Sequence, residues 1–184
     1  MEKKMKFLSL VFVSIFLVGC EKQEVKTYNV SKEINALIDT RNKDLDKPPV
    51  IVKDYSASIP DGWIERGPSG MRKVSYIIKG SNIDFYAIEL GMGDVTSNVN
   101  RWRKQIELGE LSENEIMSSV KNLNAGGIPV KYFEIFNENN NKGILAAIIE
   151  KAPSFWFFTA KGEINELKNH NSDIQRFINS IYFN

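Results

Sequence analysis

Three runs rich in β-branched and aromatic residues follow one another closely in the second half of this chain. They are residues 130–136, 143–150 and 154–160, and the turn at 137–142 is rich in asparagine. Strands joined by connections this short pair antiparallel, because a parallel pair needs a crossover of a dozen or more residues. This pattern predicts an antiparallel sheet at the centre of the fold.

Further strand patterns precede these three runs. Residues 50–59 are β-rich and end at the turn signal Pro60-Asp61-Gly62. Residues 71–79 and 83–90 are joined by Gly80-Ser81-Asn82, which predicts a hairpin.

A helical pattern interrupts the strands at residues 97–108. Its apolar face would be formed by Val99, Trp102 and Ile106. Ser97 or Asn98 is placed to cap its start.

Two more helices are predicted. Residues 112–123 open with Ser112 and carry Glu115 three residues later, which is a capping box. Residues 126–129 then break the helical pattern, and residues 170–181 carry apolar residues at helical spacing. The element order predicts an α+β fold with a mainly antiparallel sheet flanked by helices.

The first residues form a different kind of segment. Residues 1–6 are net basic and residues 7–18 are apolar apart from two serines, as in an export signal. Twelve such residues span about 18 Å as a helix, short of the bilayer core of about 30 Å. We therefore expect a signal peptide over 1–19.

This segment ends in Leu17-Val18-Gly19-Cys20, which resembles the lipobox of bacterial lipoproteins. The resemblance implies cleavage before Cys20, a diacylglyceryl thioether on its sulfur and often a fatty acid, such as palmitate, on its amine. Glu21 stands where an aspartate tends to retain enteric lipoproteins in the inner membrane, so the outer membrane, facing the periplasm, is favoured. We expect a lipidated polar tether over 20–49 and one globular domain over 50–184.

Composition removes several classes of function. The chain has 24 basic and 23 acidic residues, so it lacks the excess of positive charge typical of nucleic-acid binding. Its single cysteine is Cys20 and its single histidine is His170, which leaves no ligand set for zinc and no usual nucleophile and base pair. We expect no enzyme activity, no metal and no cofactor.

Four strings, in this order, are similar to those of a group of uncharacterised bacterial lipoproteins. They are residues 60–63, 98–105, 156–158 with Gly162 after them, and 177–181. That group resembles the PsbP-like fold, an antiparallel sheet flanked by helices in an α/β/α sandwich. The lysine that usually follows the third string is replaced by Thr159, with Lys161 two residues on, so no role of a basic group is carried over there.

The most distinctive string, Arg101-Trp102-Arg103, has two interpretations. In one, the two arginines hold a carboxylate or phosphate and the Trp102 ring is a stacking platform, while Trp63 lines an apolar pocket. In the other, Trp102 is buried on the face of Val99 and the arginines pair with acidic neighbours such as Glu107. The second is favoured because Trp102 falls on the apolar stripe.

The same choice applies to Trp63 and Trp156-Phe157-Phe158. A place in the core of the sheet is favoured over a place in the lining of a pocket. The expected function is therefore a membrane-anchored, non-enzymatic binding or assembly module of the cell envelope with a protein partner. The alternative is a small-molecule binder that uses Arg101, Arg103 and Trp63.

Overall fold

A seven-stranded antiparallel sheet organises the part of the chain that the structure, a computed structural model, describes, residues 54–184. In order across the sheet the strands are β2 (Trp63–Arg66), β3 (Arg72–Ile78), β4 (Asp84–Leu90), β8 (Ser154–Glu163), β7 (Lys142–Lys151), β6 (Ile128–Asn137) and β5 (Lys121–Ala125). Every neighbouring pair is antiparallel. The predicted α+β fold with an antiparallel sheet is confirmed.

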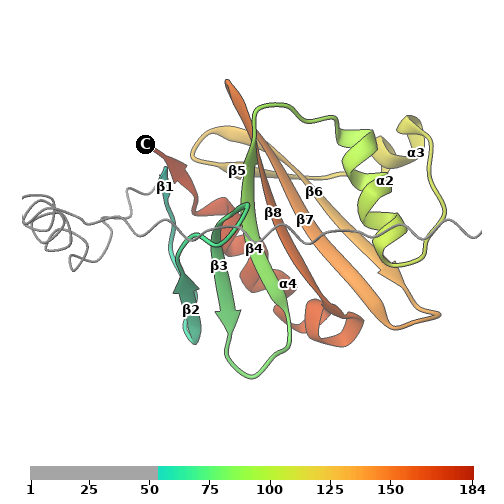
Figure 1. Ribbon diagram of the computed structural model, residues 1–184, viewed down its shortest axis with the longest axis horizontal. Coiled ribbons are helices and arrows are strands. Elements are labelled where there is room, and N and C mark those ends of the chain that lie inside the picture. Colours follow the sequence, from blue (N-terminus) through green and yellow to red (C-terminus); the bar gives the residue numbers. More distant parts are fainter. Residues whose placement is uncertain (1–53) are drawn as a thin grey trace, which may run out of the picture. The chain divides into compact units, whose positions relative to one another are not determined.

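Helices lie on both faces of this sheet. The helix α4 (Ile164–Asn179) packs on one face, and α2 (Val95–Gln105) and α3 (Glu113–Ser118) pack on the other. Figure 1 looks onto the second face, with α2 and α3 beside β6 and β7 and with β2, β3 and β4 away from these helices.

Strand β8 shows why both faces are covered. Trp156 and Phe158 belong to the core under α4, where Phe158 contacts Phe177 at a ring-centroid distance of 6.1 Å. Phe157 points to the other face and contacts Trp102 of α2 at 6.3 Å. Successive side chains of a strand point to opposite faces, so three aromatic residues in a row supply both cores. The interpretation of this string as sheet core is confirmed.

The start of α2 differs from the prediction. The helix begins at Val95 and its N-cap is Asp94, whose carboxylate accepts the backbone N–H of Ser97 at 2.6 Å. Ser97 and Asn98 lie inside the first turn, so the prediction that one of them caps the helix was wrong. Asp94 caps the helix because its ionised carboxylate is a stronger hydrogen-bond acceptor for the first backbone N–H groups than the neutral side chain of Ser97 or Asn98.

The second predicted helix is partly confirmed. Ser112 and Glu115 form the capping box, with both reciprocal hydrogen bonds present. The helix ends at Ser118, however, and the remainder of the predicted range 112–123 enters β5.

Two glycines explain that correction. Gly126 and Gly127 have φ values of 57° and 91° and connect β5 to β6 as the two central residues of a tight hairpin. Two positive φ values are what such a turn requires, and glycine adopts them without a steric penalty. The glycine pair that was interpreted as a break after a helix is the turn of a hairpin.

The C-terminal helix is longer than predicted. It begins at Ile164, immediately after β8, rather than at residue 170. Its buried residues hold it on the sheet; they are Ile164, Leu167, Ile174, Phe177 and Ile178.

A small second sheet joins the two ends of the described chain. It pairs β1 (Tyr55–Ser56), which is shorter than the strand predicted over 50–59, with β9 (Tyr182–Phe183), where no strand was predicted. Residues 50–53 of the predicted first strand, the predicted signal peptide, Cys20 and the tether lie outside the described residues. Within residues 54–184 no helix is long and apolar enough to cross a membrane.

Candidate functional site

One half of the sheet face that carries α2 presents apolar side chains to solvent. Ile64 of β2 and Ile77 of β3 lie directly opposite each other and are 51% and 42% exposed. Outward positions on a solvated sheet face are normally polar, because the alternate positions already supply the core. An exposed isoleucine pair in register therefore marks a candidate contact surface.

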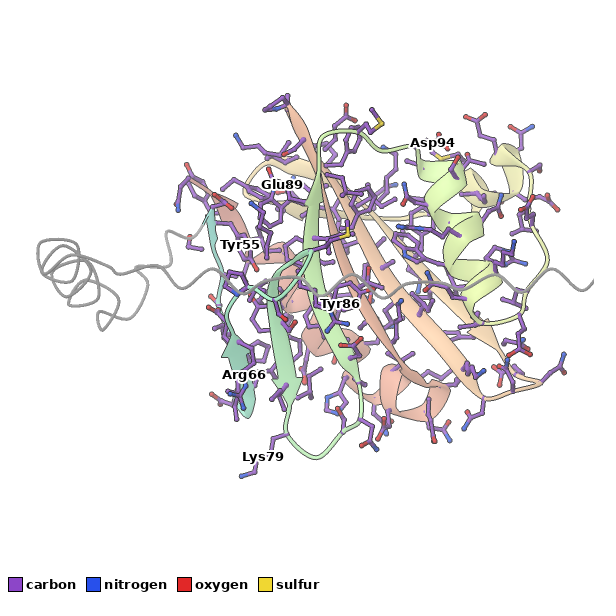
Figure 2. All side chains as sticks on the ribbon, in the orientation of Figure 1. Tyr55, Arg66, Lys79, Tyr86, Glu89 and Asp94 are labelled. Atoms are coloured by element: carbon purple, nitrogen blue, oxygen red, sulfur yellow. The ribbon has the colours of Figure 1, made fainter. Side chains whose placement is uncertain are left out.

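Polar and aromatic groups extend this surface across β3 and β4. We call the whole set the open face, and it comprises Ile64, Arg72, Ser75, Ile77, Asp84 and Tyr86. Figure 2 shows Tyr86 on β4 and Arg66 at the end of β2, both away from α2.

Arg72 fixes the centre of the open face. Its guanidinium donates two hydrogen bonds of 2.7 Å to the two carboxylate oxygens of Asp84 and lies 4.1 Å from the centroid of the Tyr86 ring. The hydrogen bond with Asp84 raises the pKa of Arg72 above its ordinary value. An irregularity in the register between Arg72 and Val74 gives β3 the extra residue typical of a bulge, and bulges re-aim side chains.

A cavity of about 650 Å³ lies at the border between the open face and the end of α2. Its walls come from α2, β7, β8, the start of α4 and the loop before β4: Asn82, Gln105, Ile106, Lys142, Gly143, Ile144, Lys161, Gly162, Glu163 and Glu166. Lys161 joins the cavity to the open face, because its ammonium lies 5.5 Å from the Tyr86 ring centroid.

The hydrogen-bond partner of Lys161 is uncharged. Its ammonium donates a hydrogen bond of 2.7 Å to Oε1 of Gln105, a neutral amide. Asp84 is its partner in register on β4, but the Asp84 carboxylate is held by Arg72. Within residues 54–184, no carboxylate forms an ion pair with Lys161.

The other charged groups of the cavity have local partners. Lys142 pairs with Glu107 at 3.0 Å, and the Glu166 carboxylate accepts the backbone N–H of Asn82 at 3.2 Å. Glu163 accepts a hydrogen bond from the side chain of Asn141 at 3.3 Å. In the described part of the chain, no group of three or more His, Cys, Asp or Glu side chains is placed to hold a metal ion.

The structure places Trp63 in the core rather than at a surface. Its exposed fraction is 9%, and its ring lies 5.3 Å from that of Phe85 and 5.6 Å from that of Phe177. It faces α4, whereas Arg101 and Arg103 project from α2 on the other face of the sheet. The three residues predicted as one binding set are thus not brought together.

Arg101 and Arg103 each have a partner close in sequence. Arg101 donates to Oδ1 of Asn98 at 2.7 Å, and Arg103 Nε donates to the carbonyl of Gly109 at 2.7 Å. The suggested pairing with Glu107 is wrong, since Glu107 pairs with Lys142. Arg101 also lines a second cavity of about 380 Å³ on the outer side of α2.

Arg103, together with Asn100 just before the string, fastens the chain that follows the helix. Asn100 both donates to and accepts from the backbone of Leu111, each at 2.9 Å, while Arg103 holds Gly109. Trp102 is 2% exposed, as the helical spacing predicted. The string therefore has a structural explanation that needs no ligand.

Sequence reasoning did not select the open face or Lys161. A signal for the open face was present, because Ile77-Ile78 and Trp63-Ile64 are adjacent apolar pairs in strands. One member of each pair must face away from the core that the other enters. Nothing local distinguishes Lys161 from the chain's other lysines.

No protein-family model matches this chain, and no curated protein matches its sequence. Several solved structures align with it. The cyanobacterial PsbP of Synechocystis sp. PCC 6803 is 14% identical, with a TM-score of 0.46, over 71% of this chain and 87% of that one. LpqN of Mycobacterium tuberculosis, described as involved in cell envelope biogenesis, is 10% identical, with a TM-score of 0.46, over 69% and 81%.

A protein from Bacteroides thetaiotaomicron is 10% identical, with a TM-score of 0.44, over 71% of this chain and 45% of that one. The α+β class itself is defined by the strand order and registers of this chain.

Proposed function

We propose that this protein is a non-enzymatic binding module of the bacterial cell envelope, held at a membrane by lipid on Cys20, and that its open face binds a protein partner. The observation that carries the binding role is the exposed isoleucine pair on a half of the sheet face that α2 and α3 leave accessible. Clusters of exposed apolar groups bounded by polar ones are typical of protein contact sites.

The size of the apolar contribution follows from the exposure. Fully burying an isoleucine side chain contributes about 1.5–3 kcal/mol, so covering the exposed half of Ile64 and of Ile77 contributes about 2 kcal/mol together. That is roughly thirtyfold in affinity. Beside them, Arg72 and Asp84 already hold each other in place, so hydrogen bonds from this pair to a partner would cost little side-chain entropy.

Site-specific photo-crosslinking tests this role. A benzophenone amino acid at position 77 should crosslink to one defined envelope protein in intact cells. The same amino acid at Met117 of α3, which is equally exposed at 43%, should not. Adding Ile64→Lys should remove the crosslink at 77. Equal crosslinking from both positions would refute a specific surface.

The membrane part of the proposal is tested separately. The mass of the native protein should correspond to a chain that starts at a lipid-modified Cys20, and Cys20→Ser should move the protein out of the membrane fraction. An unmodified thiol at position 20, or retention of the first nineteen residues, would overturn the anchor.

We also infer that the chain belongs with the lipoproteins of PsbP-like fold whose strings it shares. Two of these strings support this inference, because each has a structural role in this fold. Residues 98–105 hold the segment that follows α2, and residues 156–158 of β8 contribute side chains to the cores on both faces of the sheet. An experimental structure of a protein that carries both strings should show the same strand order. A different order would separate the two groups.

A further inference from the structure

We propose that the cavity between the end of α2, strand β8 and the loop before β4 binds a small organic monocarboxylate, with Lys161 as the counter-ion of its carboxylate. This inference concerns a small ligand and does not depend on the protein partner of the open face.

The charge of Lys161 is the first argument. A lysine ammonium has three N–H donors, and here one is used by Gln105. Within the described chain the other two have no acceptor, and Arg72 occupies the Asp84 carboxylate that lies across from Lys161 in register. A half-buried cation whose hydrogen bond within the described residues goes to a neutral amide gains from a carboxylate that takes up its two remaining donors.

The shape of the cavity is the second argument. Its volume of about 650 Å³ lies in the range of small-molecule sites, about 300–1,000 Å³. Most of the accessible surface of its lining is apolar, although Ile144, which lies opposite Lys161 in the pairing of β7 with β8, is itself fully buried behind that lining. An apolar body attached to a carboxylate is complementary to this arrangement.

The remaining charges select among anions. Glu163 and Glu166 line the same cavity, and neither forms an ion pair with a cation of the described residues. These carboxylates repel every anion, and they repel a phosphate dianion about twice as strongly as a monoanion, so of the two the cavity favours the monocarboxylate. Lys142 does not change this balance, because it is already paired with Glu107.

The test uses the full lipidated protein in detergent and matched pairs of probes. Butyrate and phenylacetate, at millimolar concentration, should raise the melting temperature, and the neutral butyramide and phenylacetamide should not. Lys161→Met should weaken carboxylate binding at least tenfold. Lys142→Met, which removes the paired lysine of the same cavity, should leave it nearly unchanged.

A second measurement keeps the proposal testable if Lys161→Met does not fold. In wild-type protein labelled with ¹³C at the lysine ε-carbons, which leaves every ammonium unmodified, phenylacetate should shift the Lys161 signal and leave those of the remaining lysines unchanged. Ile64→Lys, which disrupts the open face, should not alter this shift. The carboxylate site and the protein-binding surface can therefore fail their tests independently. No carboxylate-dependent shift, equal binding of the amides, or stronger binding of inorganic phosphate would overturn the proposal.

Discussion

Replacing Trp102 by alanine should destabilise the fold by about 4 kcal/mol, close to the middle of the range of 3–5 kcal/mol observed for deletion of large buried aromatic side chains. The side chain is 2% exposed and contacts Phe157 edge to face at 6.3 Å. A buried tryptophan removes about 150–250 Å² from water, which at about 25 cal/mol per Å² corresponds to roughly 4–6 kcal/mol. Partial collapse of the remaining cavity lowers the observed loss.

Urea denaturation followed by far-UV circular dichroism measures this change. The midpoint should fall while the slope with denaturant stays the same, because the unfolded surface is nearly unchanged. Arg101→Ala is the matched control on the same helix. Its side chain is exposed and bonds only to Asn98 among the described residues, so we expect a change within about 0.5 kcal/mol.

The result that would refute this reasoning is a loss below about 1 kcal/mol for Trp102→Ala, a value typical of surface positions. Such a result would mean that the Trp102 ring is accessible. The interpretation of this string as a ligand clamp would then regain support.

Two further predictions concern stability. Gly143→Ala would place a Cβ atom 2.7 Å from Cδ1 of the buried Leu167, so calorimetry should show that the free energy of unfolding falls by about 1–3 kcal/mol. In the control Gly91→Ala the added Cβ meets no atom within 4 Å, so stability should be unchanged or slightly higher. Equal effects of the two substitutions would contradict the packing argument. The pKa of Glu89 is lowered, first by its hydrogen bond with Lys73, so its contribution is present above the ordinary carboxyl pKa and is lost as pH falls through the lowered value. Glu89→Gln should therefore cost about 0.5–1 kcal/mol at neutral pH, and this cost should decrease as the pH falls through the lowered pKa of Glu89. A cost that is independent of pH would exclude the ion pair as its cause.

Much of the local structure could be predicted because its causes are local. Antiparallel pairing of β6, β7 and β8 follows from their short connections, and the capping box at Ser112 follows from two residues in one turn. The helix expected to continue to residue 123 fails at β5, because pairing with β6 outweighs a modest helical preference. The position of β8 beside β4 depends on contacts between distant residues, and no pattern in the sequence specifies it.

The candidate site was less predictable than the fold. Trp102 was correctly expected in the core, since helical spacing places it beside Val99. Trp63, Arg101 and Arg103 were grouped by residue type, but the two faces of the sheet separate them. Residue type shows what a side chain can bind, and only its neighbours show whether it is available to do so.

The order of residues by itself predicted the antiparallel pairing of β6, β7 and β8, the capping box at Ser112 and the buried face of α2, and it predicts how the N-terminal segment is processed. These properties depend on spacing along the chain and on the chemistry of adjacent residues. The tertiary structure alone decided that α2 leaves half of one sheet face accessible, and that Arg72 occupies the carboxylate opposite Lys161. Lys161 meets Gln105 across 56 residues of chain, so its lack of a charged partner within the described residues arises from packing between distant elements.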